Sequence, residues 1–138
     1  MNRTFVDTSG WYAYVNAADA HHSRVGRAFR ACPGRLVTSS YVFDELVTLC
    51  RYRLGHAIAV KAGALLLSAG KLDIVRITAE DERAAWALFQ EKPDQPFSFT
   101  DCTSFVLMRR LGLTCALALD DDFAREGFEL LPGSRAAS

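Results

Sequence analysis

The sequence lacks any apolar run approaching the roughly 20 residues that a transmembrane helix requires. It also lacks the apolar region of a signal peptide, because Asp7 interrupts the first hydrophobic segment. Neither sign of charge is in excess, since 16 basic and 16 acidic side chains cancel. We therefore expect a cytoplasmic protein with no membrane partner and no overall positive field, although a local basic patch remains compatible with this balance.

Metal-binding spacings of cysteine and histidine are missing as well. The four cysteines are far apart in sequence and form no Cys-x-x-Cys pair. His21 and His22 are adjacent, so their side chains diverge on a helix and make a poor chelate. We expect the cysteines to be small buried apolar residues rather than disulfides or zinc ligands. They are Cys32, Cys50, Cys102 and Cys115.

Short apolar segments alternate with segments of helical periodicity along the 138 residues, half of which are hydrophobic. Strands are expected at 3–6, 36–38, 72–77, 113–119 and 128–131. Helices are expected at 11–16, 19–31, about 41–54, 57–69, 82–90 and 101–111. Strands that alternate with helices indicate a parallel sheet covered on both faces. The unbroken apolar run Cys115–Leu119 suits a strand buried on both faces.

The predicted fold class is therefore α/β, a three-layer α/β/α sandwich with a central, mostly parallel sheet of about four or five strands. No linker, repeat or low-complexity stretch divides the chain. We expect a single domain over residues 1–132, followed by a polar C-terminal tail at 133–138.

Four acidic residues stand at the edges of the most apolar elements. Asp7 follows the first predicted strand, Asp120 follows the strand that ends at Leu119, and Asp101 opens the helix before that strand. Glu45 lies on or beside the apolar face of the third helix. Singly, each acid has an ordinary explanation: a helix cap, an arginine partner or a charged turn. Together they predict one cleft, because ligands of an open parallel sheet bind beyond the carboxyl ends of its strands.

Carboxylates gathered in one cleft repel each other by about 4 kcal/mol per pair at ~4 Å and an effective dielectric near 20. Either a proton or a cation must therefore accompany them. Oxygen ligands without histidine or cysteine favour a hard cation such as Mg²⁺ or Mn²⁺. Such ions generate hydroxide and stabilise the leaving oxygen of a phosphodiester, so the predicted chemistry is metal-dependent hydrolysis.

Four motifs resemble those of the PIN-domain family, above all its VapC-type toxins. They are Phe5–Gly10, Ser39–Leu46, Phe97–Cys102, and Leu119–Phe123 with Gly127-Phe128. The resemblance covers nearly the whole chain in order. It implies a PIN-like fold and a Mg²⁺- or Mn²⁺-dependent endoribonuclease that hydrolyses RNA phosphodiester bonds. It further implies the toxin of a type II toxin–antitoxin system, a homodimer inhibited by a cognate antitoxin.

The same resemblance implies roles for the acids. Asp7 and Asp101 correspond to metal ligands, while Glu45 and Asp120 act on the metal directly or through water. Asp122 stays open as the fourth acid or an auxiliary, because three acids follow one another there. The implied catalytic residues are Asp7, Glu45, Asp101 and Asp120. Ala118 stands where the family often has Thr or Ser, so one hydroxyl near the metal is missing.

Further assignments remain open at this point. Hydroxyls near the acids either cap helices, which we prefer, or orient metal ligands. Basic residues on the third and later helices are assigned to solvated surface in preference to RNA contact. The aromatic residues are assigned to the core in preference to base stacking or a dimer interface. The residues concerned are Thr8, Ser9 and Thr100; Arg51, Arg53, His56, Lys61, Arg109 and Arg110; and Trp11, Tyr12, Tyr14 and Tyr41. The alternative function is a non-catalytic PIN-like RNA- or protein-binding module, against which the four acids argue.

Overall fold

Five parallel strands form one sheet in the order β3-β2-β1-β4-β5 in the computed structural model, which describes residues 2–133. Most of the predicted polar tail, residues 134–138, lies outside the described residues, as does Met1. The strands are β1 (Arg3–Val6), β2 (Arg35–Ser39), β3 (Leu72–Val75), β4 (Cys115–Leu117) and β5 (Glu129–Leu131). Every strand pairing is parallel, which confirms the predicted sheet.

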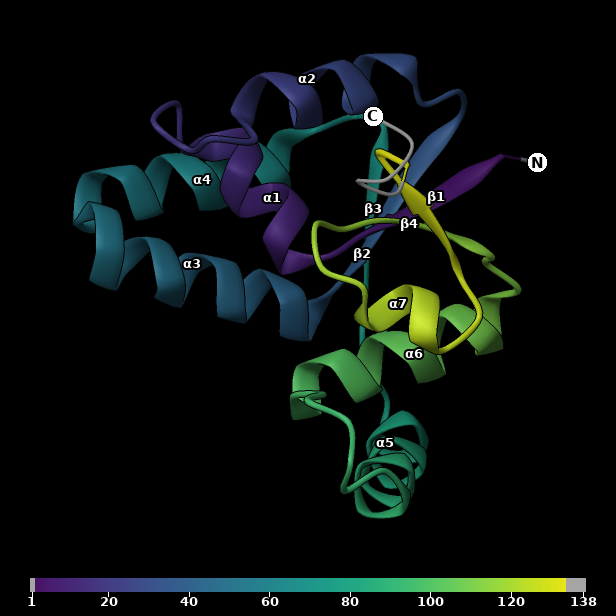
Figure 1. The fold of residues 1–138 in the computed structure, drawn as a ribbon. Coiled ribbons are helices and arrows are strands. Elements are labelled where there is room, and N and C mark those ends of the chain that lie inside the picture. The colour runs from purple at the N-terminus through teal and green to yellow at the C-terminus, as the bar shows by residue number, and fades with distance from the viewer. Residues whose placement is uncertain (1, 134–138) are drawn as a thin grey trace.

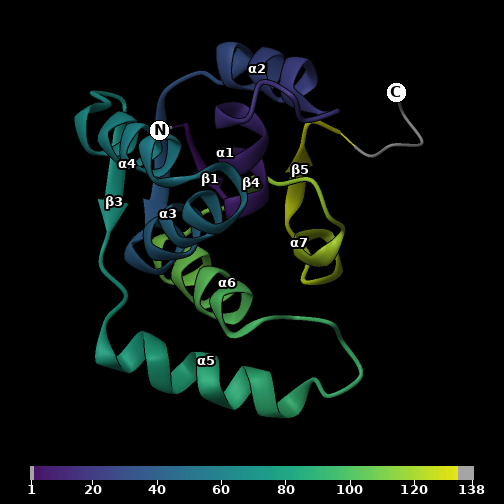
Figure 2. The ribbon, with the colours of Figure 1, turned by 90° about the vertical axis from the view of Figure 1, so that its left-hand side faces the viewer.

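The helices cover both faces of this sheet, so the predicted three-layer α/β/α architecture is confirmed. The chain's helices are α1 (Thr8–Val15), α2 (His22–Ala31), α3 (Ser40–Leu54), α4 (His56–Ser68), α5 (Ala79–Glu91), α6 (Phe99–Leu111) and α7 (Asp122–Arg125). Helices α1 to α4 lie on one side of the sheet and α5 to α7 on the other (Figure 1). Helix α5 packs outside α6 and lies farthest from the sheet (Figure 2).

The central position of β1 creates the point at which a ligand site is expected. The chain leaves β1 toward β2 and β3 on one side, then crosses back to place β4 on the other side. In open parallel sheets a crevice forms where the strand order reverses, outside the carboxyl ends of the strands. That point lies between β1 and β4, next to Asp7.

Several element boundaries differ from the sequence prediction: α1 begins at Thr8 rather than 11, α2 at His22 rather than 19 and α5 at Ala79 rather than 82, while β3 ends at Val75 rather than 77. Two further differences lie beside the predicted site. The strand expected at 113–119 pairs only over Cys115–Leu117. After Leu117 the amide of Ala118 still donates to the Leu131 carbonyl at 3.0 Å, but the amide of Leu119 turns to the Ser9 hydroxyl at 3.0 Å. The helix expected to begin near Asp101 begins at Phe99, since Ser98 rather than Thr100 is the N-cap. The preferred capping role of Thr100 is therefore wrong.

The core joins the central strands to α3, α6 and α7. Phe5 of β1 and Phe105 of α6 are fully buried, and both rings contact that of Phe123 in α7, with centroid distances of 6.1 and 4.9 Å. Burying one such side chain contributes about 1.5–3 kcal/mol to folding. All four cysteines are free, and three are buried as predicted, whereas Cys115 is half-buried. No helix between residues 2 and 133 is long and apolar enough to cross a membrane.

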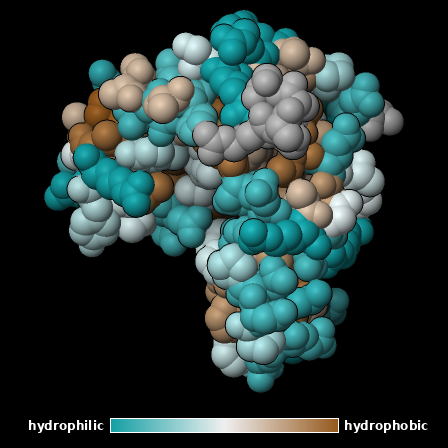
Figure 3. Space-filling view, viewed as in Figure 1, coloured by the Kyte–Doolittle hydropathy of each residue, from teal (hydrophilic) through white to brown (hydrophobic). Residues whose placement is uncertain are grey.

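The surface is deeply hollowed between the part that carries α3 and α4 and the part that carries α5 and α6 (Figure 3). The first turns of α1, α3 and α6 border this region (Figure 1). Since α1 begins directly after β1 and α3 directly after β2, both helices start at the carboxyl edge of the sheet. The fold thus brings the predicted acids toward one edge.

Candidate active site

Asp7 links the end of β1 to the start of α1. Its amide donates to the carbonyl of Leu117 in β4 at 3.0 Å, and its side chain caps α1 by accepting from the amide of Ser9. The Ser9 hydroxyl also donates to Asp7 Oδ2 at 2.9 Å. The side chain is buried, and burial together with the charges of Asp101 and Asp120 raises its pKa from 3.8 to about 7. Asp7 is therefore both a helix cap and a carboxylate that burial makes costly to ionise.

Asp101 stands in the first turn of α6 as part of a capping box. Its Oδ2 accepts from the amide of Ser98 at 2.9 Å, while its own amide donates to the Ser98 hydroxyl at 3.0 Å. Burial raises the pKa of Asp101 to about 6; the charges of Asp120 and Asp122 add to this, and the Ser98 bonds offset part of it. Only Oδ2 is used by the cap, which leaves Oδ1 for other partners.

Glu45 lies on the face of α3 that is directed at α1. Its Oε1 accepts a hydrogen bond of 2.5 Å from the hydroxyl of Thr8, the first residue of α1. The alternative explanation from sequence, an ion pair with Arg51 or Arg53, is not what the described residues form. Thr8 therefore orients Glu45, and the preferred capping role for Thr8 is wrong because Asp7 provides the cap.

The two candidates for the fourth acid differ in their surroundings. Asp122 pairs with Arg125 at 2.9 Å, one turn along α7. Burial and the charge of Asp120 raise the pKa of Asp122, and Arg125 offsets part of that rise. Asp120 faces the cavity described below, whereas Asp122 is absent from its lining. One Asp120 oxygen accepts from the amide of Asp122 at 3.1 Å, which orders the turn between them.

A cavity of about 350 Å³ brings Asp7, Glu45, Asp101 and Asp120 together. They come from the ends of β1 and β4 and the early turns of α3 and α6. The other residues that line it are Thr8, Ser9, Tyr12, Asp19, Leu49, Arg53 and Leu119. With Asp19, five carboxylates line the cavity. Two of them, Asp7 and Asp101, have raised pKa values, and together these oxygen donors suit a hard divalent cation. Among residues 2–133, however, no three acidic, histidine or cysteine side chains are already grouped tightly enough to hold an ion.

Two small residues fix this edge of the sheet. The preferred capping role of Ser9 is wrong, because Asp7 caps α1 and Ser9 instead orients Asp7, which was the alternative. The role of Gly10 was not predicted. Ser9 joins Asp7 to the amide of Leu119 through one hydroxyl. A Cβ on Gly10 would lie 2.7 Å from a methyl and 2.8 Å from the carbonyl oxygen of Leu117, so α1 approaches β4 more closely than any other residue type permits. The run of small residues after Asp7 is the signal that could have indicated such a close approach.

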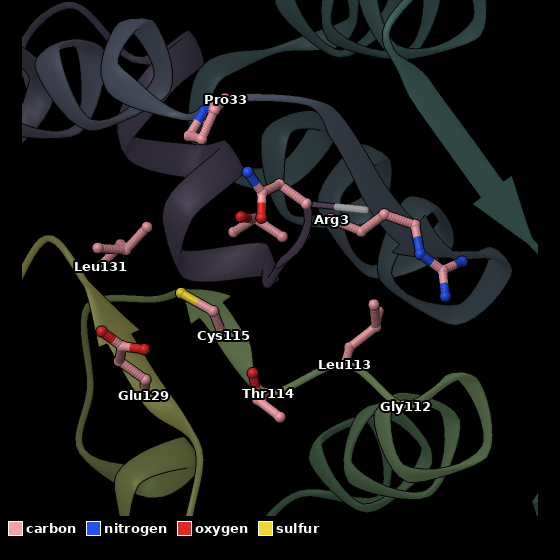
Figure 4. A pocket seen from close by; sticks show the side chains of 10 residues that line it. Arg3, Pro33, Gly112, Leu113, Thr114, Cys115, Glu129 and Leu131 are labelled. Atoms are coloured by element: carbon pink, nitrogen blue, oxygen red, sulfur yellow. The ribbon is translucent and has the colours of Figure 1, made fainter.

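A second cavity of about 370 Å³ lies at the opposite, amino edge of the sheet. Thr114, Cys115, Glu129 and Leu131 face it from β4, β5 and the approach to β4, with Pro33 across the opening (Figure 4). It contains a single carboxylate, that of Glu129. The two cavities have similar volumes, so the number of carboxylates, and not the size, distinguishes the cavity at the carboxyl edge as the candidate active site.

The basic residues at the far end of α6 have structural partners. Arg110 forms an ion pair of 2.8 Å with buried Asp81 at the start of α5. Arg109 pairs with Glu126 at 3.0 Å. These two arginines hold α5 and α7 onto α6, and neither faces the acidic cavity.

The sequence matches the model of one protein family, that of the PIN domain, over residues 4–129. It is 40% identical over 124 residues to the 23S rRNA-specific endonuclease VapC20 of Mycobacterium tuberculosis, covering 90% of this chain and 94% of the relative. It is 29% identical over 113 residues to a VapC ribonuclease of Archaeoglobus fulgidus, covering 78% of this chain and 71% of that one.

Solved structures resemble the whole described fold. The crystal structure of M. tuberculosis VapC20, described as a Sarcin-Ricin loop cleaving toxin, superposes with a TM-score of 0.87 at 38% identity and covers 91% of this chain and 95% of that one. VapBC2 of Rickettsia felis, bound to a fragment of promoter DNA, superposes with a TM-score of 0.69 at 14% identity, covering 93% and 96%. At that identity the second likeness concerns the fold alone.

Proposed function

The chain belongs to the PIN domain family, and from that membership we propose that its acidic cavity is the active site of an endoribonuclease toxin. The protein is a VapC-type ribonuclease that hydrolyses RNA phosphodiester bonds. One observation carries this function: the four acids nominated from the sequence, which come from separate parts of the chain, line a single cavity at the carboxyl edge of the sheet. A binding module that cuts nothing does not need a buried acid such as Asp7, whose pKa is raised by burial and by the charges of neighbouring acids.

The residues fit a Mg²⁺ or Mn²⁺ ion, with Asp7 and Asp101 as its ligands and Glu45 and Asp120 acting directly or through water. When bound, the ion supplies Lewis-acid stabilisation of charge on phosphate oxygens and a more acidic water. Ser9 and Ser98 fix the carboxylates of Asp7 and Asp101 by donating to one oxygen of each. Glu45, oriented by Thr8, is left with Oε2 to accept a proton from water.

We take the substrate to be structured ribosomal RNA. The relative from M. tuberculosis carries the description 23S rRNA-specific endonuclease, and it matches this chain over nearly its full length. Ribosomal RNA is a cytoplasmic substrate, so we place the protein in the cytoplasm. Incubation of purified ribosomes with the protein and Mn²⁺, followed by mapping of 23S rRNA ends, is expected to reveal one cut within the sarcin–ricin loop.

Substitution of one proposed ligand tests the site. Asp101→Asn keeps the shape of the side chain and is expected to reduce cleavage by about 100-fold or more, since a ligand contributes at least as much as its supporting shell. Asp94→Asn is the matched control, because Asp94 is exposed in the loop before α6 and lies outside the cavity. Chelation with EDTA should act as Asp101→Asn does. Equal cleavage by all these samples would exclude the assigned site, and RNA binding without cleavage would favour the binding module.

Two exposed apolar patches are available to protein partners. On α5, Trp86 and Phe89 are 55% and 40% exposed and stack with ring centroids 5.9 Å apart. On α3 and α4, Tyr52, Val60 and Leu67 are 84%, 55% and 71% exposed. Exposed apolar patches of this kind mark interaction surfaces.

We assign these patches to a homodimer contact and to a cognate antitoxin, in keeping with the VapC family. Trp86→Ala and Tyr52→Ala, each measured by sedimentation and by antitoxin titration, identify which patch serves which partner. Loss of self-association in one variant and of antitoxin binding in the other is the expected result. If neither variant changes either measurement, both assignments are wrong.

A further inference from the structure

One wall of the acidic cavity changes character along helix α3. Glu45, Leu49 and Arg53 all line the cavity, and they follow one another at four-residue intervals along one helix face. The wall therefore passes from a carboxylate through an apolar side chain to a guanidinium. From sequence alone, Arg53 and Arg51 were both expected on the solvated surface. The structure separates them, because Arg53 lines the cavity and Arg51 does not.

Arg53 reaches this position without an acidic partner. Over residues 2–133 its guanidinium takes part in no ion pair, even though acids line the same cavity. It lies instead over the ring of Tyr12 from α1, with its central carbon 5.6 Å from the ring centroid. A cation on an aromatic face keeps its N–H donors free around its edge. Asp19, which also lines the cavity, has one oxygen occupied by the amide of His21 at 2.8 Å.

We propose, on the premise that the cavity cleaves RNA, that Arg53 stacked on Tyr12 binds a phosphate that flanks the scissile one. Without such a ligand, the Arg53 guanidinium has no anionic partner among residues 2–133. An RNA strand laid along α3 presents its scissile phosphate to the carboxylates and a neighbouring phosphate to Arg53. Arginine suits this task because its planar fork matches two phosphate oxygens at once.

The spacing along α3 selects a flanking phosphate. Glu45 and Arg53 are eight residues apart, which corresponds to about 12 Å along the helix axis at 1.5 Å per residue. Successive nucleotides of a stacked strand rise by about 3.4 Å, so this span exceeds one nucleotide step even when the arginine side chain leans back along the helix. Arg53 thus contributes to substrate binding and leaves the bond-breaking step to the acids.

Kinetics distinguish the two steps. With a synthetic sarcin–ricin loop hairpin as substrate, Arg53→Gln is expected to raise KM about tenfold, the scale of one charge-assisted hydrogen bond, and to leave kcat unchanged. Arg51→Gln is the matched control, since it removes the same charge from the same helix end outside the cavity, and its effect on KM should be much smaller. Equal effects of the two variants, or a fall in kcat with constant KM, would overturn the proposal.

Binding without cleavage gives an independent measurement. In an Asp7→Asn background, affinity for the fluorescein-labelled hairpin is followed by anisotropy at increasing salt. Loss of one phosphate contact should lower the slope of log affinity against log salt by about 0.7 to 0.9 when Arg53 is replaced by glutamine. Arg53→Lys should recover part of the affinity, as should Tyr12→Phe relative to Tyr12→Leu, because the charge and the ring are retained. An unchanged slope would reject the phosphate contact.

Chemical removal of charge from the RNA then locates the contact. Methylphosphonate linkages are introduced one at a time around the cleavage position of the hairpin. One flanking linkage should weaken binding to the Asp7→Asn protein and have no effect once Arg53 is also replaced, which is the signature of a direct pair. A hairpin that binds but shows no such linkage rejects the Arg53 inference alone. No binding and no cleavage of any RNA would reject the proposed function itself.

Discussion

The hydroxyl of Ser9 accepts a hydrogen bond from the amide of Leu119 at 3.0 Å. The same hydroxyl donates to Asp7 Oδ2 at 2.9 Å. One side chain at the start of α1 therefore ties the carboxylate after β1 to the chain that leaves β4.

Ser9→Ala is expected to lower the free energy of unfolding by about 1–3 kcal/mol, since a part-buried amide loses its acceptor. It should also reduce RNA cleavage by roughly 10–100-fold, because Asp7 loses the donor that orients it. Urea unfolding and a cleavage assay measure the two effects. Ser68→Ala removes an exposed hydroxyl that bonds only within α4 and is expected to leave both quantities unchanged. A similar loss in both variants would show that the bridge has no special role.

The metal-free protein should become less stable as the pH rises toward neutrality. The pKa of Asp7 is about 7 in the folded protein, above its ordinary 3.8, because of burial and the charges of Asp101 and Asp120. The unfolded chain therefore releases this proton first, and stability is lost between about pH 4 and pH 7. Asp7→Asn removes that loss, so in EDTA the variant should gain at most about 4 kcal/mol over the wild type at pH 8, at 1.36 per unit of pKa.

Thermal melts of both proteins at pH 5 and pH 8 check this expectation. The difference should favour the variant at both pH values and be clearly smaller at pH 5, where at most about 1.6 kcal/mol of the loss has developed, than at pH 8. If the proposed metal site is right, saturating Mn²⁺ should reverse the order at pH 8, because only the wild type keeps every proposed ligand. A variant that is destabilised equally at both pH values would contradict the raised pKa of Asp7.

The ion pair between Arg110 and Asp81 should stabilise the protein with the opposite pH dependence. Burial alone tends to raise the pKa of Asp81, but hydrogen bonds from Arg110 and Thr78 outweigh it and hold the pKa below 3.8. The stabilisation is present above the unfolded pKa and is lost as the pH falls through the lower folded value. Arg110→Gln is expected to cost about 1–3 kcal/mol at pH 7, less than a fully buried pair because Arg110 is partly exposed.

Urea unfolding at pH 7 and near pH 3 measures this contribution. The gap between Arg110→Gln and the wild type should narrow at the lower pH, where Asp81 takes up a proton. Arg83→Gln serves as the control, since Arg83 is exposed on α5 and should change stability by no more than about 0.5 kcal/mol. A gap that is independent of pH would mean that Arg110 acts through packing rather than charge.

Gly10→Ala should disturb the active edge through the backbone. The added Cβ would meet the Leu117 carbonyl oxygen at 2.8 Å, and a strand carbonyl cannot move aside. The strain is expected to cost about 1–3 kcal/mol and to displace α1, which carries Thr8 and Ser9. Gly26→Ala in α2 meets only the flexible end of Arg30 at 3.4 Å and should be neutral or stabilise by roughly 0.5–1 kcal/mol. Chemical denaturation and RNA cleavage of the two variants provide the comparison.

The fold class could be predicted from the local pattern of apolar and polar residues. The switch between strand and helical periodicity indicated a parallel three-layer fold, and the strands and helices of the structure follow that order along the chain. The predicted element boundaries beside the site were wrong where a side chain from a distant segment binds a backbone group that would otherwise pair within the strand. The amide of Leu119 leaves the β4 ladder because the Ser9 hydroxyl, 110 residues earlier, accepts its hydrogen bond. The sequence around Leu119 contains no pattern from which the bond to Ser9 could be predicted.

Residue types and their order along the chain were enough to nominate Asp7, Glu45, Asp101 and Asp120. Acids beside buried strands stand out because an unpaired carboxylate in an apolar environment is costly. The convergence of these acids on one cavity was decided only by the crossing of the chain from β3 back to β4, which sets β4 against β1. The tertiary structure also separated Asp120 from Asp122 and Arg53 from Arg51, pairs that look equivalent in sequence. The residue types along the chain therefore indicated the chemistry of the site. Which side chains line the cavity depends on distances in space, so only the tertiary structure decided it.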